Sequence, residues 1–250
     1  MKITKEISIS IKPIQQNEHL VQIIGNTPII FNRMSEKVKR DLLIGSRRKT
    51  EADKKKIKHN VVDDYKASVH KQVNGETFLC FPSTGIKGAM ATAAIETDGV
   101  AKTNVNRLIF LPDEYIPIYG KPLLSMAVVR TAGISKAPDI RTRCMIREWC
   151  SEFKIRFAVP TFDKTSIFSL ITNAGFMCGI GDNRQEKGKG NFGTFSLIST
   201  REDKSKFEKI KKLGYDYQKK EMQKELPNFS DEETKELYEF YQKDLIRRVA

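Results

Sequence analysis

The first part of the chain alternates between apolar and polar side chains. Residues 3–12 and 19–24 follow this period of two, which predicts two strands. A turn is expected between them, around residues 13–17. The stretch from Ser35 to Ile44 instead places apolar side chains at helical spacing behind a hydroxyl cap, so it predicts a short amphipathic helix.

The middle of the chain alternates between short apolar strands and helices. Strands are predicted at residues 78–81, 107–111 and 152–159. The first of these runs into an alanine-rich helix over residues 83–95, in which Ser83 is the expected cap. A second helix is predicted over residues 163–175, where Asp163 or Thr165 is a suitable cap and the glycines that follow end the helix.

The order of these elements predicts the fold class. With a final strand at residues 193–200, they run strand, helix, strand, strand, helix, strand, which is the ferredoxin-like order. We therefore expect an α+β, RRM-like domain over residues 1–200, with an antiparallel sheet and helices on one face. This arrangement leaves the other sheet face or a groove for a ligand.

Two basic insertions and a charged tail are expected outside this order. The insertion near residues 45–75 begins with a run, residues 45–60, that holds seven lysines and arginines against two acids. The insertion at residues 124–147 is interrupted by glycine and proline. Residues 201–250 are rich in lysine and glutamate and predict a helical C-terminal extension, whose last helix opens with a capping box at residues 230–233.

Composition indicates a polyanionic partner. Lysine and arginine number 44 against 31 acidic residues, a net charge of +13, and nucleic acid is the first candidate for so basic a chain. No apolar stretch approaches the roughly 18 residues of a membrane span, and the first residues do not resemble a signal peptide. We therefore expect a cytoplasmic protein with no membrane partner.

The cysteines indicate neither a disulfide framework nor a metal site. Cys80, Cys144, Cys150 and Cys178 form no C-x-x-C pair, and zinc ligands usually come in closer pairs. They are expected to be reduced and mostly buried. No P-loop sequence is present, so no cofactor and no metal are expected.

A glycine-rich loop is expected from Gly179 to Gly193. It contains G-x-G-x-x-G at residues 188–193, but the glycines precede a strand and do not open a helix, which argues against a dinucleotide site. Glycine lets a backbone approach a ligand closely, and exposed N–H groups bind phosphate. The expected phosphate ligands and stacking residue here are Arg184, Lys187, Lys189 and Phe192.

Three further segments are expected to contact a nucleic-acid backbone. Ser83 and Thr84 open a helix beside Lys87, which predicts an anion site at a helix N-terminus. The basic insertions add charge that binds phosphate without sequence preference. Their expected ligands are Lys54, Lys55, Lys56, Arg130, Lys136, Arg141 and Arg143.

Three ordered motifs resemble a family of uncharacterised bacteriophage proteins. They are GNTP with SEKVK, then FPSTGIKGAM, then GIGDNRQEKGKGNFGTF, and together they span roughly residues 18–199. Two positions depart from the family pattern, Gln185 in place of proline and Gly88 in place of alanine. The helix start and the glycine loop also resemble the RAMP superfamily, which includes the guide-RNA-binding backbone subunits of CRISPR effector complexes.

The resemblance implies a protein without catalytic activity that coats single-stranded nucleic acid. Phage DNA in replication or recombination is the expected strand, with copies arranged side by side as a homo-oligomer and possible filaments. A RAMP-type RNA-binding subunit or a metal-independent RNA endonuclease stays open, with His59 or His70 as the base. A structural protein that binds an acidic partner is the third alternative.

Overall fold

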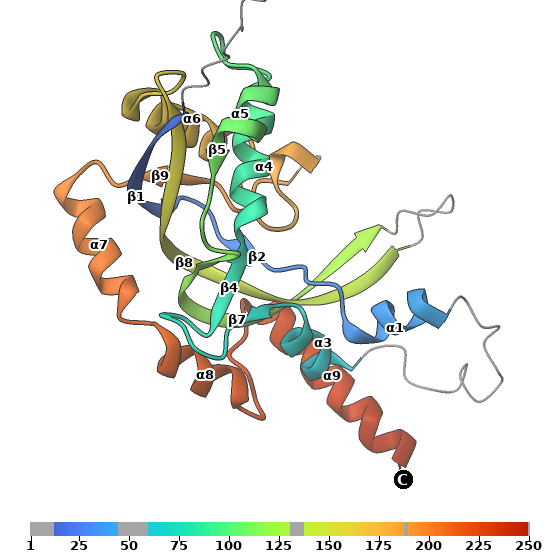
Figure 1. The fold of residues 1–250 in the computed structure, drawn as a ribbon. Coiled ribbons are helices and arrows are strands. Elements are labelled where there is room, and N and C mark those ends of the chain that lie inside the picture. Colours follow the sequence, from blue (N-terminus) through green and yellow to red (C-terminus); the bar gives the residue numbers. More distant parts are fainter. Residues whose placement is uncertain (1–12, 45–59, 131–137, 188–189, 250) are drawn as a thin grey trace, which may run out of the picture.

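The structure is a computed structural model of the chain, and within its described residues the fold is mixed α/β with eight α-helices and antiparallel sheets (Figure 1). The described residues are 13–44, 60–130, 138–187 and 190–249. The strand predicted at residues 3–12 lies outside them. No helix among the described residues is both long and apolar enough to cross a membrane.

The larger sheet is built around one long strand, β8. Its strands are β1 (Gln15–Gly25), β2 (Ile29–Ile30), β5 (Ile109–Phe110), β7 (Tyr119–Arg130), β8 (Pro138–Val159) and β9 (Phe195–Leu197). Cys150 of β8 pairs with both Ile24 and Tyr119, so β1 and β7 flank β8 on opposite edges. β9 pairs with the outer edge of β1, and β2 and β5 add short pairs along β8.

Three predicted boundaries in this sheet are wrong. Residues 15–17 belong to β1 and not to a turn. Residues 107–108 end a helix, α5 (Lys102–Leu108), so only the two residues of β5 follow as strand. Most of the expected insertion at residues 124–147 is instead strand, because β7 and β8 form a long hairpin that projects beyond the sheet (Figure 1).

A β-bulge divides β8 into two halves. Between the pairs Gly120–Trp149 and Pro122–Ile146, two residues of β8 oppose one residue of β7. The extra residue reverses the alternation, so odd-numbered side chains such as Phe153 face the main core beyond the bulge and even-numbered ones such as Ile146 face it before the bulge.

Two helices cover the main face of the sheet. They are α4 (Ser83–Ala93) and α6 (Lys164–Met177), and both bury apolar side chains at helical spacing. Asp163 caps α6, because its carboxylate accepts the Ser166 N–H at 2.7 Å. The glycine-ended second helix predicted from the sequence is therefore confirmed, with Asp163 as the cap.

The sequence predicted helices on one face of the sheet only, and this prediction is wrong. Helix α7 (Arg201–Lys211) covers part of the opposite face, where Phe207 and Ile210 pack on three buried side chains of the sheet. Those side chains are Ile24, Tyr119 and Cys150. The far face is therefore only partly open to solvent.

The region expected as the first insertion contains core elements in its second half. Helix α3 (Val61–Ala67) buries Val61 and Tyr65 almost completely. After it, β3 (His70–Lys71) joins β4 (Leu79–Pro82) and β6 (Tyr115–Pro117) in a second, three-stranded antiparallel sheet. Helix α1 (Glu36–Ile44) is confirmed, but its apolar residues Leu42 and Leu43 are exposed.

The tail forms helices, as predicted, and these pack against the rest of the chain. Helix α8 (Tyr215–Gln223) buries Gln218, whose side chain accepts the Leu79 N–H at 3.0 Å and donates to Ile118 O at 2.8 Å. Helix α9 (Glu232–Val249) follows a segment that runs beside β7. The cap of α9 is Asp231, which accepts the Thr234 N–H at 2.8 Å, and not the predicted serine.

Candidate nucleic-acid interface

A groove of about 500 Å³ lies between the start of α1, helix α3 and the outer half of β8. Arg33 and Ser35 line it from the segment before α1, and Ala67 lines it from α3. Arg141 and Arg143 line it from the projecting hairpin. The groove therefore brings together three arginines from distant parts of the sequence.

Backbone hydrogen bonds hold Arg33 at the groove. Phe31 N–H donates to Cys144 O at 2.9 Å and continues the pairing of β2 along β8. Arg33 N–H then donates to Ser68 O at 2.8 Å, at the end of α3. Because Ser68 Oγ also accepts the Cys144 N–H at 2.8 Å, α3, β8 and the segment carrying Arg33 are fixed to one another.

The two outer arginines of the groove are accessible to a ligand. The Arg141 side chain is 47% exposed, and its guanidinium lies 3.6 Å from the Asp139 carboxylate. The Arg33 guanidinium contacts Glu36 at 2.5 Å and is 28% exposed. Glu36 is exposed, so its pair with Arg33 is weak and a phosphate can compete for Arg33. The Asp139 carboxylate is mostly buried, but it reaches Arg141 through Nε at 3.6 Å, and the half-exposed guanidinium can also meet a phosphate.

Arg143 has a different role, because its side chain is mostly buried. It forms an ion pair with Asp182, which lies in the glycine loop. Burial lowers the pKa of Arg143, and the nearby charge of Arg141 lowers it further. Arg143 therefore ties the hairpin to the glycine loop, and Arg33 and Arg141 are the guanidiniums left to meet a ligand.

A second group of cations continues from Arg33 onto α3 and β3. Burial lowers the pKa of Lys71, and the charges of Arg33 and Lys66 add to this effect. The pKa of His70 is also lowered, first by burial and then by Arg33 and Lys39. Burial is the larger cause of both shifts, and the further lowering by Arg33, Lys39 and Lys66 shows that these cations lie close to His70 and Lys71.

Aromatic rings lie among these cations. The His70 ring lies 5.4 Å from the Tyr115 ring, and the Lys71 ammonium lies 5.9 Å from the centre of the Phe78 ring. Phe78 in turn meets Tyr215 of α8 edge to face at 5.8 Å. All four rings are half-buried, so each keeps part of its surface open to solvent.

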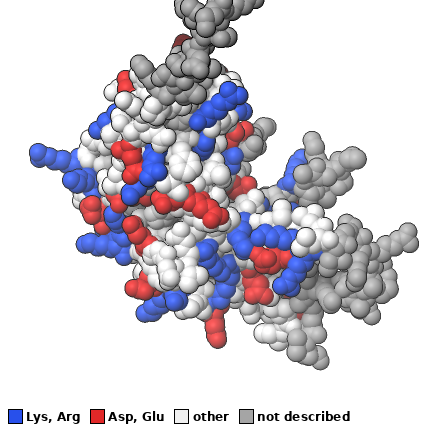
Figure 2. Space-filling model, viewed as in Figure 1, with Lys and Arg blue, Asp and Glu red and all other residues white. Residues whose placement is uncertain are grey.

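We define the basic–aromatic surface by the residues of the groove and of this second cluster. Its cations are Arg33, Lys39, Lys66, Lys71 and Arg141, and its rings are those of His70, Phe78, Tyr115 and Tyr215. Figure 2 shows that acidic side chains are interleaved with basic ones over this view of the molecule. Asp64 and Asp139 also line the groove, so the surface is not uniformly basic.

The glycine loop is packed against the chain between β1 and β2. Asp182 N–H donates to Ile30 O at 2.9 Å, and Gly193 N–H donates to Pro28 O at 2.8 Å. Ile180 N–H donates to Gly193 O at 2.9 Å across the loop. The expectation of a run of exposed N–H groups is therefore wrong for these three groups, because each already has a protein acceptor.

Arg184 stabilises the loop from inside. Its Nη1 donates to Gly181 O at 2.7 Å, and its Nε donates to Glu186 at 2.8 Å. Glu186 also accepts from Thr92 Oγ1 at 3.0 Å, near the C-terminal end of α4. Phe192 is half-buried, and its N–H donates to Asn183 O at 3.3 Å.

The start of α4 differs from the predicted anion site. The helix begins at Ser83 behind Pro82, with no side-chain cap, and Ser83 N–H donates to Glu114 O at 2.9 Å. Thr84 is exposed and Lys87 is half-exposed. The glycine loop contacts this helix at Thr92, nine residues or about 13 Å further along, so the two expected phosphate sites do not adjoin.

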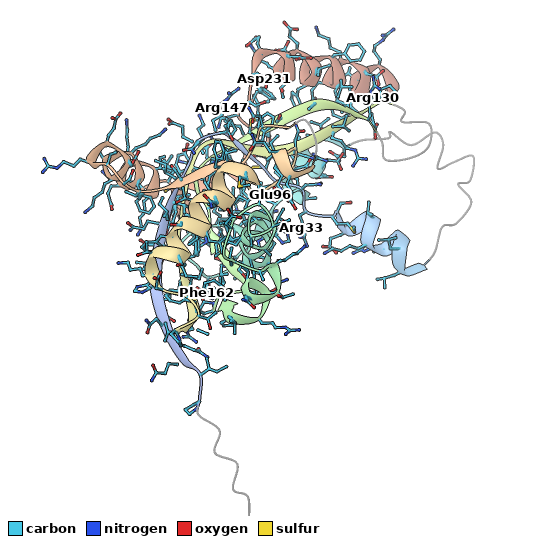
Figure 3. All side chains as sticks on the ribbon, turned by 90° about the horizontal axis from the view of Figure 1, so that it is seen from above. Arg33, Glu96, Arg130, Arg147, Phe162 and Asp231 are labelled. Carbon is cyan, nitrogen blue, oxygen red and sulfur yellow. The ribbon has the colours of Figure 1, made fainter. Side chains whose placement is uncertain are left out.

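The remaining predicted ligands are dispersed or undescribed. Arg130 is exposed at the outer end of β7, well away from Arg33 (Figure 3). The other ligands lie outside the described residues: Lys54, Lys55, Lys56, Lys136, Lys189 and the side chain of Lys187. The structure thus brings Arg141 and Arg143 together with Arg33, which the sequence had not indicated.

Sequence reasoning missed most of the basic–aromatic surface. Arg33, Lys66, Lys71 and Tyr115 carry no shared motif and lie far apart along the chain. The fold joins them because α3 packs on β8 and β3 pairs with β4. These residues can therefore be recognised as one surface only from the tertiary structure.

Groups with catalytic or metal-binding chemistry are buried or dispersed. All four cysteines are buried, as predicted, and burial raises the pKa of Cys80 and Cys144 to about 12. His19 stacks on Phe157 at 5.6 Å, and His59 lies outside the described residues. Within the part of the chain that the structure describes, no three His, Cys, Asp or Glu side chains are placed to hold a metal ion.

The sequence was compared with known proteins. No family model matches the chain, and no curated protein matches it.

Proposed function

We propose that the protein binds single-stranded nucleic acid without catalysis and largely without sequence preference. The observation that carries the proposal is the basic–aromatic surface, in which Arg33 and Arg141 flank a groove and Lys71 lies among aromatic rings. Single-strand binding combines positive charge that follows the backbone with rings on which bases stack. The net charge of +13 supports the same partner.

A ferredoxin-like, RAMP-type core is part of this proposal. The strand order β9–β1–β8–β7 supports it, since consecutive neighbours in that series are paired. Helix α4 lies in sequence between β1 and β7, and helix α6 lies between β8 and β9. This is the arrangement expected of two interleaved βαβ units.

The proposed setting is the coating of phage DNA during replication or recombination, with copies arranged along the strand. The motif resemblance to phage proteins supports DNA as the strand. The arrangement of copies along the strand is carried over from the same resemblance.

The proposal is tested by removing the two accessible groove arginines together. Arg33→Ala with Arg141→Ala is expected to weaken binding of a single-stranded oligonucleotide equally for different base sequences. Each lost phosphate contact lowers the slope of log affinity against log salt by about 0.7 for single strands, so the double variant should lose about 1.4. Gel shift over a salt series measures both quantities.

The matched control is Lys204→Ala with Lys209→Ala on helix α7, where both lysines are exposed. It removes the same charge from a helix on the other side of the molecule from α1 (Figure 1). Equal weakening by the two double variants would reject the groove as the site. Binding only to an acidic protein, with no shift of any oligonucleotide, would reject the function.

RNA cleavage is a second candidate, favoured by one observation. His70 lies beside Tyr115 and next to Lys71, and burial lowers its pKa, which favours the neutral imidazole that a general base requires. The same gel shift with labelled RNA tests this candidate. Cleavage that disappears in His70→Ala would replace the non-catalytic proposal with a metal-independent endonuclease.

A further inference from the structure

The outer edge of β1 is incompletely paired. Strand β9 pairs with Ile23, Ile24 and Gly25 only. No strand among the described residues pairs with the outer edge of residues 15–21, although their inner edge is paired with β8 throughout. An open strand edge presents unpaired N–H and C=O groups, and native proteins usually cover such an edge.

An open hollow of about 570 Å³ lies along α6, on the helix-covered face of the sheet, and Phe168 in its lining meets His19 of β1 at 6.3 Å between ring centres. Lys164, Phe168 and Thr172 of α6 line it, together with Leu197 of β9. The hollow exists because α6 is 14 residues long whereas β9 has only 3, so the helix extends beyond the strand that it covers. One more strand beside β1 would fill it.

The sequence holds a segment whose pattern fits this place. Residues 3–12 carry isoleucine at positions 3, 7, 9 and 11 and only polar side chains at the even positions. The two faces of β1 differ in the same way. His19 points toward α6 and meets Phe168 at 6.3 Å, whereas Glu18 on the other face pairs with Arg156 at 2.5 Å.

The position of Pro13 favours a second copy as the source of this strand. Residues 3–12 could reach the edge of their own β1 only by reversing direction immediately before Gln15, where β1 begins. Pro13 and Ile14 are described and carry no turn. Proline fixes φ near −65°, whereas the favoured two-residue hairpin turns need positive φ at their first position.

We propose that residues 3–12 of one copy, the N-terminal arm, add as a strand to the outer edge of residues 15–21 of a second copy. Ile7, Ile9 and Ile11 would fill the hollow beside Phe168 and Leu197, and the even-numbered side chains would join the polar face at Glu18. Each copy both donates an arm and accepts one, so the arrangement closes as a dimer or continues as a chain. The inference rests on the proposed function in one respect only: a row of linked copies would serve to coat a single strand of nucleic acid.

Association without nucleic acid tests this inference. Ile7→Lys with Ile9→Lys places charge on the apolar face of the arm and should convert the protein to monomers in sedimentation and light-scattering measurements. The matched control, Ser8→Lys with Ser10→Lys, adds the same charge to the polar face and should leave association at least partly intact. Association that is equal in the two variants, or absent from the unaltered protein, would overturn the inference.

Disulfide capture identifies the source of the arm. One batch carries Leu20→Cys, an exposed position on the polar face of β1, and a second, tagged batch carries Ser8→Cys on the polar face of the arm. Glu6→Cys and Ser10→Cys test the neighbouring registers. Mixed disulfides between the two batches are expected. A third protein carries both cysteines in one chain, and a disulfide that forms within this chain but not between the two batches would assign the arm to its own copy.

These tests are separable from the proposed function. The Arg33 and Arg141 variants leave the arm intact, and association is measured with no oligonucleotide present. Loss of association in the arm variant with unchanged salt dependence of single-copy binding would support the arm alone. Association unaffected by the arm changes would reject the arm, whether or not the groove binds nucleic acid.

Discussion

At the scale of single residues, the glycines of the loop serve close packing more than ligand binding. Gly193 has φ of +72°, and a Cβ atom there would lie 1.7 Å from the Ile180 carbonyl oxygen. Gly88, one of the two positions that depart from the expected phage-family pattern, is exposed on α4, and a Cβ atom there meets nothing within 4 Å. Backbone conformation and packing therefore require glycine at position 193, whereas neither requires it at position 88.

Alanine at these two positions should change stability in opposite directions. Gly193→Ala is expected to cost about 2 kcal/mol or more, because it combines a left-handed backbone with a backbone clash. Gly88→Ala should stabilise the protein by about 0.4–1 kcal/mol by reducing the entropy of the unfolded chain. Urea unfolding measures both, and a stable Gly193→Ala protein would contradict the packed loop.

Sequence reasoning located the glycine loop but misassigned its hydrogen bonds. The order of loop and strand was enough to argue against a dinucleotide site, because that argument needs only neighbouring residues. The acceptors Pro28 and Ile30 lie more than 150 residues away along the chain, so no local pattern indicates that the loop N–H groups are occupied. The same distance hides the ion pair of Arg143 with Asp182.

At the scale of elements, an aspartate accepts hydrogen bonds at the start of three helices. In α6, backbone and side-chain hydrogen bonds from Ser166 lower the pKa of Asp163. In α7, hydrogen bonds from Thr200 and Ser199 lower the pKa of Asp203. Before α9, burial raises the pKa of Asp231, but hydrogen bonds from Ser230 and Thr234 outweigh it and the pKa is lowered.

These caps predict a loss of stability in acid. A carboxylate whose pKa is lowered on folding binds fewer protons in the folded than in the unfolded chain, so its contribution is full above the unfolded pKa of about 3.9. The contribution is lost as pH falls from there through the lower folded pKa. Asp203→Asn should therefore destabilise the protein at pH 7, and the difference from the unaltered protein should vanish below the folded pKa.

Urea unfolding at a series of pH values measures this effect. Asp113→Asn, in the loop before β6, is the matched control for the loss of one negative charge. A pH-independent difference for Asp203→Asn would contradict the assigned role of the carboxylate. The α6 cap was predicted from the sequence. The α7 capping box was not, although Thr200 and Asp203 follow the local pattern of a hydroxyl residue three positions before an acid.

The sequence predicted an element correctly where its pattern is local. It failed where pairing with a distant strand decides whether a segment is strand or loop. The apolar periods of α1, α6 and β4 are visible in the sequence. Residues 124–147 carry glycine, proline and five basic side chains, which indicated a loop, but pairing between β7 and β8 holds most of them as strand. Charged residues are tolerated there because Arg130 and Arg141 are exposed and Arg143 is paired with Asp182.

At the scale of the whole molecule, the tail helices complete the structure. Phe207 and Ile210 cover part of one face of the sheet. The buried Gln218 side chain forms hydrogen bonds with Leu79 of β4 and with Ile118, which follows β6. Arg147 donates to Ser230 O at 2.7 Å and lies beside Asp231 at the start of α9 (Figure 3). Each contact crosses the break that composition placed near residue 200.

Residues 1–200 alone are therefore expected to lose cooperative folding. Without residues 201–250, the side chains of Ile24 and Cys150 would be exposed. The Leu79 N–H would also lose its buried acceptor, which costs about 1–3 kcal/mol for that group alone. Urea unfolding and amide NMR dispersion check this. A soluble fragment with a single sharp transition would instead identify residues 201–250 as a separable extension.

The order of elements and the helical tail could be predicted at this scale, but the packing between them could not. Composition distinguished the tail because its surface is charged, and the buried positions at Phe207, Ile210 and Gln218 are too few to alter that composition. Their partners lie on strands and loops more than 50 residues away, so their burial is a property of the tertiary structure.

The bulge in β8 fixes which face of the β7–β8 hairpin each side chain occupies. The extra residue at Arg147–Glu148 decides which side of the outer strand carries Arg141 and Arg143 and which carries Cys144 and Ile146. A single-residue insertion or deletion there would exchange these sets and direct the arginines inward. Over evolutionary time the hairpin is thus free to lengthen at its tip by pairs of residues, while the bulge must keep its count, and the tip is where related chains should differ in length.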